Sequence, residues 1–136
     1  MSSMAQKVAY AVFKDFTLTF YYNDKKPQGA YDVENLIQVP GYFREHPEKL
    51  PSPYRSPWIQ KNFTDYYYKE WDSVHNQIKT IVFDKSFKEY RPKNCSHWFA
   101  RCNNLTSIKG IKNNLNTSEA TNNGVYVFLV FKPYKP

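Results

Sequence analysis

Residues 78–83 read Ile-Lys-Thr-Ile-Val-Phe, and residues 99–108 read Phe-Ala-Arg-Cys-Asn-Asn-Leu-Thr-Ser-Ile. Leu105 and Ile108 repeat, further along the chain, the spacing with which Ile78 and Ile81 open the first stretch. A spacing of three suits a coil whose apolar side chains point inward at successive corners, where a cysteine acts as a small hydrophobe. We therefore expect seven residues to form a stacked core: Ile78, Ile81, Phe83, Phe99, Cys102, Leu105 and Ile108.

This pattern fits the core of a leucine-rich repeat, and the offset from 78 to 105 falls within the period of about 20–29 residues that this class shows. Such repeats cannot bury their apolar face alone, and about three copies are normally needed, whereas about one and a half are recognisable here. The rest of the chain must then close the stack. We predict a β-rich α+β fold in which an N-terminal hairpin region packs onto a short leucine-rich-repeat-like solenoid. Residues 1–136 would form a single cooperative domain, with 1–73 as the capping region and 74–136 as the repeat-like region.

Local signals outside the repeat agree with a β-rich domain. Residues 8–13 and 17–22 are apolar or alternating and predict a β-hairpin. Residues 86–90 predict a short helical turn that ends before Arg91-Pro92. The run Val-Tyr-Val-Phe-Leu-Val-Phe at 125–131 predicts a final buried strand, while residues 30–39 fit either a strand or a short helix.

The residues around the second copy extend into a longer signature. Residues 98–111 read WFARCNNLTSIKGI and residues 115–121 read LNTSEAT, and together with residues 78–83 they resemble the BspA-like leucine-rich-repeat proteins of gut and oral bacteria. The resemblance implies a solenoid-like fold, export to the cell surface, and protein binding or adhesion. Two departures, an extra asparagine at 113–114 and Asn-Asn-Gly at 122–124, indicate a truncated repeat array.

The net charge of +7 lies entirely in the second half of the chain. Residues 1–78 contain nine Lys/Arg and nine Asp/Glu, whereas residues 79–136 contain ten Lys/Arg and three Asp/Glu. A basic half attracts nucleic acid, anionic glycans, acidic proteins or membrane surfaces, or it is a solvated face without a partner. We expect no membrane span, since no apolar stretch approaches about 18 residues, and no signal peptide is visible.

Metal, thiol and cofactor chemistry find little support in the sequence. Cys95, His97 and Cys102 offer three ligands, whereas structural zinc normally takes four. A catalytic Cys95–His97 pair would need a third group to orient the imidazole, and none can be nominated. Four glycines are too few for a glycine-rich phosphate loop. We therefore expect no metal and no cofactor.

Acid–base and sugar-binding chemistry depend on one aromatic segment. Asp65, Glu70 and Asp72 stand beside residues 66–68 (Tyr-Tyr-Tyr) and Trp71, as paired carboxylates do in glycosidases. The same residues equally describe a solvated edge next to core rings, which is the interpretation we favour. Residues 66–68 and Trp58 form either a sugar-stacking face or half-buried packing. We expect no catalytic residues.

The sequence thus predicts a non-catalytic protein-interaction module, of adhesin type and located at the cell surface, whose partner is a host or bacterial surface protein. The candidate binding residues are the basic side chains Arg101, Lys109 and Lys112. The alternative is a basic cytosolic protein that binds nucleic acid. In that case the interleaved aromatic and basic residues at 87–91 and 98–101 would stack on bases.

Overall fold

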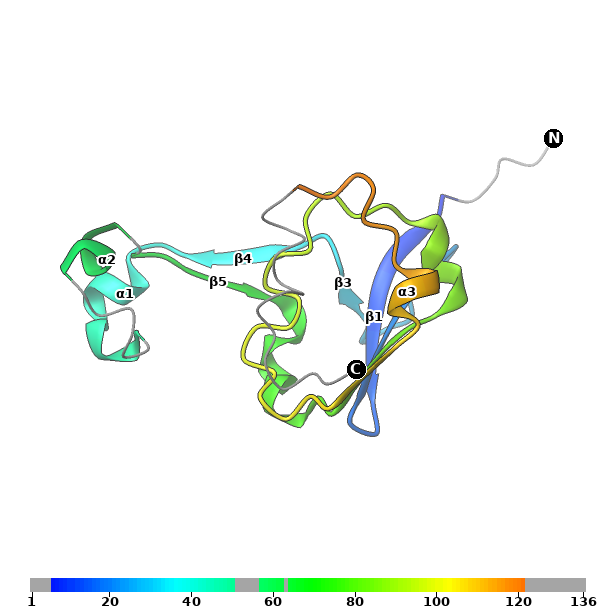
Figure 1. Ribbon diagram of the computed structural model, residues 1–136, viewed down its shortest axis with the longest axis horizontal. Helices are drawn as coiled ribbons and strands as arrows, with labels where there is room; N and C mark the ends of the chain where they lie inside the picture. Colours follow the sequence, from blue (N-terminus) through cyan, green and yellow to red (C-terminus); the bar gives the residue numbers. More distant parts are fainter. Residues whose placement is uncertain (1–5, 51–56, 63, 122–136) are drawn as a thin grey trace. The chain divides into compact units, whose positions relative to one another are not determined.

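The computed structural model describes residues 6–50, 57–62 and 64–121. The chain divides into two compact units (Figure 1). We call the larger one, formed by the residues before Leu36 and after Tyr68, the sheet unit, and the smaller one, Leu36–Tyr68, the inserted unit. The predicted β-rich α+β class is confirmed. The predicted strand at 125–131 lies outside the described residues. That residues 1–136 form a single cooperative domain stays a prediction.

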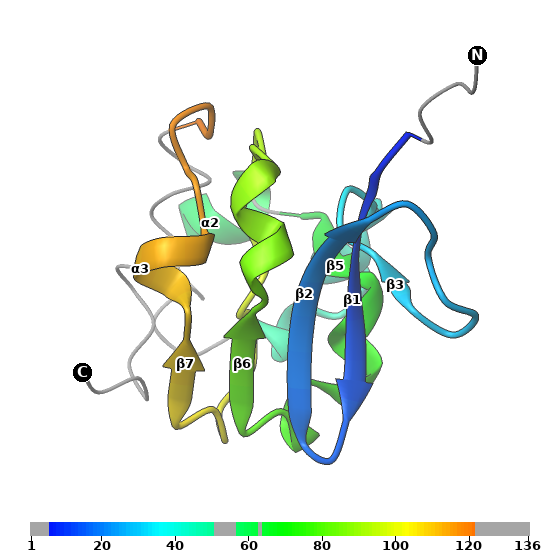
Figure 2. The same cartoon turned by 90° about the vertical axis from the view of Figure 1, so that its right-hand side faces the viewer.

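A five-stranded mixed sheet organises the sheet unit (Figure 2). Its strand order is β3-β1-β2-β6-β7, in which β1 runs antiparallel to both β2 and β3, whereas β2, β6 and β7 run parallel to one another. The strands are β1 (Val8–Lys14), β2 (Thr17–Asn23), β3 (Tyr31–Asp32), β6 (Thr80–Phe83) and β7 (Ser107–Lys109).

Short helical turns connect the parallel strands. The 3-10 turn η3 (Glu70–Gln77) precedes β6, η4 (Lys85–Glu89) follows it, and the helix α3 (Ile111–Asn114) follows β7. Asp84 caps η4, because its side chain accepts a hydrogen bond from the Ser86 amide at 2.9 Å. The predicted helical turn near residues 86–90 is therefore confirmed.

The predicted hairpin is confirmed as β1 and β2 joined by a two-residue turn. Asp15 and Phe16 have φ angles of 53° and 61°, as a type I′ turn requires. The Phe16 carbonyl accepts hydrogen bonds from the amides of Lys79 at 2.8 Å and Thr80 at 3.2 Å. The hairpin turn thereby holds the start of β6 beside β2.

The register of the parallel strands repeats the spacing of the sequence. Ile81 on β6 lies opposite Ile108 on β7 and opposite Leu18 on β2, so the sheet pairs the two isoleucines that the repeat spacing relates. The Thr106 amide donates to the Lys79 carbonyl at 2.9 Å, which continues the same offset before the strands begin. Two consecutive segments of the chain therefore follow the same course side by side.

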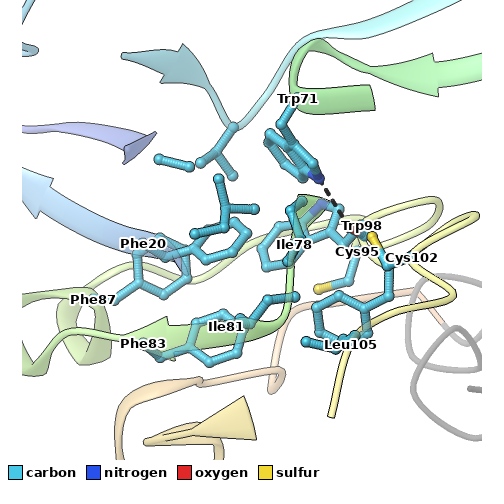
Figure 3. Packing of buried hydrophobic residues seen from close by; sticks show 14 of the residues in the cluster. Phe20, Trp71, Ile78, Ile81, Phe83, Phe87, Cys95, Trp98, Cys102 and Leu105 are labelled. Carbon is cyan, nitrogen blue, oxygen red and sulfur yellow. Dashed lines mark hydrogen bonds between the residues drawn. The ribbon is translucent and has the colours of Figure 1, made fainter. Parts of the chain in front are cut away.

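The core lies under one face of the sheet (Figure 3). The Phe20 ring occupies its centre: it stacks on Phe83 (centroids 4.9 Å apart) and Trp98 (5.1 Å) and meets Trp71 edge-on (5.3 Å). Such aromatic pairs add about 0.5–1.5 kcal/mol each beyond the burial of their area. The expected core residues Ile78, Ile81, Phe83, Phe99, Cys102 and Leu105 are buried, and Ile108 is half-buried against them.

The inserted unit is a two-stranded sheet with short helices. Its strands are β4 (Leu36–Val39) and β5 (Tyr66–Lys69), which reaches one residue beyond the unit, and its helices are α1 (Tyr42–Glu45), η1 (Pro47–Lys49) and α2 (Pro57–Asn62). Residues 30–39, for which the sequence left strand and helix open, contain β3 and β4.

Hydrogen bonds within the sheet unit join the place where the chain leaves this unit to the place where it returns. The Glu70 carboxylate accepts hydrogen bonds from the Asp32 amide at 2.8 Å and from the Asn35 side chain at 2.9 Å. The buried Lys69 ammonium donates to the Val33 carbonyl at 2.6 Å. We call these bonds of Lys69 and Glu70 the clasp, because they join residues 32–35 to residues 69–70 within the sheet unit.

Gly110, which follows β7, lies close to the backbone at the end of β6. Its φ is +78°, and a Cβ at this position would lie 2.4 Å from the Phe83 carbonyl oxygen, whereas Gly29 has a φ of +85° with nothing within 4 Å. We expect Gly29→Ala to cost about 1–2 kcal/mol for the left-handed backbone alone. Gly110→Ala should lower the free energy of unfolding clearly further, because the Phe83 backbone must also move. Urea unfolding followed by tryptophan fluorescence measures both, and equal losses would contradict the stacked arrangement.

Candidate binding surfaces

The face of the sheet opposite the core carries small polar side chains in rows. Side chains alternate along a strand, so the residues between the buried ones point to this outer face. The register places Thr17, Thr80 and Ser107 in one row and Thr19, Val82 and Lys109 in the next. These six residues, which we call the outer face, are half-buried or exposed.

The structure separates the three basic residues that the sequence nominated. Lys109 is exposed and lies on the outer face at the end of β7, and Lys112 is exposed on α3 immediately beyond it. Arg101 lies in the segment before β7, and its guanidinium donates from Nε (2.9 Å) and Nη2 (2.7 Å) to the Asp72 carboxylate. Arg101 thus joins two consecutive segments of the chain, whereas Lys109 and Lys112 lie on neighbouring elements.

Asp72 fixes η3 against the following segment. Besides the Arg101 guanidinium, its carboxylate lies 3.7 Å from Nδ1 of His75, and the same ring nitrogen lies 2.6 Å from the Asp72 carbonyl oxygen. Because the Asp72 side chain is only 18% exposed, its pairing with Arg101 avoids leaving a charge buried without a partner. The role of Asp72 in the structure is therefore to hold the fold.

The other two carboxylates considered for acid–base chemistry also have structural partners. Hydrogen bonds from the Gly41 amide and the Gln38 side chain lower the pKa of Asp65 in the inserted unit. Partial burial raises the pKa of Glu70, but the bonds from Asn35 and Asp32 outweigh it and leave that pKa below its usual value. A general acid of a glycosidase needs a raised pKa, and neither Asp65 nor Glu70 has one.

The cysteines belong to the core. Cys95 and Cys102 are free, and their exposed fractions are 0% and 2%. Burial raises the pKa of each thiol to about 12, whereas a nucleophilic cysteine requires a lowered value. Burial, together with Arg101 and Lys69, lowers the pKa of His97. Within residues 6–50, 57–62 and 64–121, no three His, Cys, Asp or Glu side chains come together as a metal site.

The tyrosine run serves mainly the packing of the inserted unit. The Tyr66 ring lies 5.1 Å from Tyr42 and 5.8 Å from Phe43, and the Tyr67 hydroxyl accepts a hydrogen bond from Gln38 at 3.2 Å. Trp58, by contrast, is 65% exposed. Half-buried packing therefore describes the tyrosines better than a sugar-stacking face does. This description does not cover Trp58, which is exposed.

A shallow hollow of about 650 Å³ adjoins η4 and α3, which pack against each other. In the part of the chain that the structure describes, its lining contains three cations, Lys88, Arg91 and Lys112, and one carboxylate, Glu89. We call it the basic groove. Sequence reasoning nominated Lys112 for protein binding and placed Lys88 and Arg91 only in the alternative nucleic-acid platform at 87–91. It did not group the three cations, because the turn that brings η4 beside α3 leaves no periodic signal in the chain.

Sequence reasoning also missed two groups that position these surfaces. Trp71 and Trp98 are separated by the repeat period itself, and Nε1 of Trp71 donates to the Trp98 carbonyl at 2.9 Å. That offset was available from the sequence. Burial lowers the pKa of Lys69 despite the neighbouring Glu34, Asp32 and Glu70 carboxylates. The sequence gives no sign that Lys69 is buried, because nothing in its sequence context distinguishes it from a surface lysine. No helix in the described part of the chain is long and apolar enough to cross a membrane.

The buried thiols give a direct test of the core assignment. With a pKa of about 12, the thiolate fraction of Cys95 and Cys102 at pH 8 is on the order of one in ten thousand. We expect neither thiol of the folded protein to react with Ellman's reagent within minutes at pH 8, and both to react once the chain is unfolded in urea. Rapid reaction of either thiol in the folded protein would contradict the core role.

Comparison with known proteins gives no relative from which a function can be carried over. No protein-family model, no curated protein and no solved structure matches the chain. Its family is therefore not shown, and functional inference depends on the surfaces described above.

Proposed function

We propose that this chain is a short leucine-rich-repeat protein of the BspA-like kind that acts as a non-catalytic protein-interaction module. The observation that carries the proposal is the parallel pairing of β6 with β7, in which Ile81 faces Ile108 at the offset of the sequence repeat. A parallel strand followed by a turn, recurring at this period over a shared core, is the arrangement expected of stacked leucine-rich repeats. We propose that this stack is a short solenoid.

The outer face is the surface that we assign to the partner. Adjacent strands hold its side chains about 4.8 Å apart, so Thr19, Val82 and Lys109 need little ordering when a partner binds. Hydroxyl groups, one valine and one lysine offer hydrogen bonds, a small apolar contact and a charge. A standard interface uses about 20–30 residues a side, so six residues suit a weak contact or one that extends beyond this face.

Adhesion at a cell surface is the role that the BspA-like resemblance adds. We propose that the chain works outside the cell and that its partner is a protein of a host or bacterial surface. The carboxylates and thiols considered for catalysis have structural partners or lie in the core, which agrees with a module that binds without catalysis.

Nucleic-acid binding is the second candidate, and the excess of positive charge in residues 79–136 favours it. Its stacking platform is not supported, however. Phe87, Trp98 and Phe99, three of the aromatic residues that would contact bases, are at most 3% exposed. Of the nominated rings only Tyr90 is half-buried and not fully buried, so what is left for nucleic acid is a phosphate contact with at most one of these rings. The protein-binding proposal accounts for more of the structure.

Site-specific photocrosslinking on intact cells tests this proposal. The full chain, with benzoylphenylalanine in place of Val82, is added to cells of the source organism and to host epithelial cells. We expect irradiation to give an adduct that disappears if the cells are first treated with trypsin and persists after nuclease treatment. The matched control carries the probe at Lys25, which is exposed in the turn after β2 and away from the outer face.

Two outcomes would sink the proposal. One is an adduct that nuclease removes and trypsin does not, which would favour nucleic acid. The other is equal crosslinking from positions 82 and 25, which would show contact without a specific face. Protease shaving of intact source cells checks the location separately: loss of the chain from whole cells is expected, and protection until lysis would contradict a surface role.

A further inference from the structure

The basic groove collects groups from two parts of the sheet unit that are distant in sequence. One side comes from η4 and the residues just after it, and the other from α3 and the loop that follows. In Figure 2, α3 lies beside the helical turn that rises from the end of β6. The lining residues are Lys88, Glu89, Arg91, Lys112, Asn113, Leu115, Asn116, Thr117 and Ser118.

The charge in the groove favours an anion. Within the described residues, Lys88 and Lys112 form no ion pair, so both ammonium groups are available to a ligand. Among the described residues, Glu89 is the one carboxylate in the lining. Even with the Glu119 carboxylate that lies beside Arg91 counted in, three cations face two carboxylates and the surface stays positive. A concave basic surface concentrates anionic ligands by electrostatic attraction.

Arg91 already shows which anion the groove accommodates. Its Nε lies 3.8 Å from the carboxylate of Glu119, and the two side chains are 49% and 52% exposed. An exposed ion pair of this length contributes little to stability, so a carboxylate from outside can replace Glu119. A ligand carboxylate that contacts Arg91 would therefore compete with Glu119, which touches Arg91 but is not among the lining residues.

The uncharged lining distinguishes among anionic partners. The side-chain amides of Asn113 and Asn116 and the hydroxyls of Thr117 and Ser118 match the donors and acceptors of a peptide backbone. Oδ1 of Asn116 accepts from the Ser118 amide at 3.0 Å, which fixes the shape of that wall. Among the described residues no aromatic ring lines the groove, so it offers neither bases nor sugar rings a stacking surface.

We propose that the basic groove binds an acidic peptide segment, whose carboxylates contact Lys88, Arg91 and Lys112 and displace Glu119 from Arg91. The proposal rests on the proposed function in one respect: it names the chemistry of a protein partner at a second surface. The test of the groove uses a synthetic peptide and no cells. Peptide binding to the groove can therefore fail while partner binding through the outer face holds, and partner binding through the outer face can fail while peptide binding to the groove holds.

Fluorescence anisotropy with a fluorescein-labelled deca-glutamate peptide and the full chain tests the groove. The double variant Lys88→Glu, Lys112→Glu should weaken binding by about tenfold or more, because it replaces two attractive contacts with repulsive ones. The matched control is Lys14→Glu, Lys25→Glu, which makes the same change in net charge at two exposed lysines outside the groove. We expect the control to change the affinity by less than about threefold.

Glu119→Gln supplies a gain of function that a damaged fold cannot mimic. Removing the competing carboxylate should tighten peptide binding by about two- to fivefold. Circular dichroism confirms that each variant folds. Equal losses in the two double variants, or no gain from Glu119→Gln, would overturn the proposal. The proposal would also be overturned if a heparin oligosaccharide or a single-stranded DNA of equal charge bound more tightly than the peptide and lost this binding in the Lys88→Glu, Lys112→Glu variant.

Discussion

The parallel pairing of β6 with β7 is the constraint on which the rest of the sheet unit depends. Parallel neighbours cannot be joined by a tight turn, so the chain between them must cross over the sheet. Here that crossover, residues 84–106, brings Cys95, Trp98 and Phe99 under the strands and buries them. Register matters as much as direction, because a slip of one residue would turn Lys109 toward the core and Ile108 toward water.

The aromatic core and the clasp make this arrangement compatible with a large insertion. Phe20 contacts rings from β6, η3 and the crossover, so its burial links elements that are distant in the chain. The Glu70 carboxylate and the Lys69 ammonium join the exit and return points directly, within the sheet unit. The sheet therefore continues from β2 to β6 although the inserted unit lies between these strands in the sequence.

The sequence predicted the parts of this structure that depend on burial at a regular spacing, namely the hairpin, the equal spacing of Ile81 and Ile108 in the two paired strands, and most of the core. It missed contacts between polar residues that are distant in the chain, because such contacts leave no periodic trace. Arg101 was nominated for binding because nothing local shows that Asp72 holds it. The equal offset of Trp71 and Trp98 was present in the sequence, and a search at the repeat period that included aromatic residues finds it.

Inter-strand nuclear Overhauser effects in the labelled full chain test the central claim most directly. The account predicts backbone contacts between β6 and β7 in parallel order, with Thr80 opposite Ser107, Ile81 opposite Ile108 and Val82 opposite Lys109. Contacts in antiparallel order, or in a register shifted by one residue, would contradict it. Either result would also remove the stacked repeat from which the proposed function is drawn.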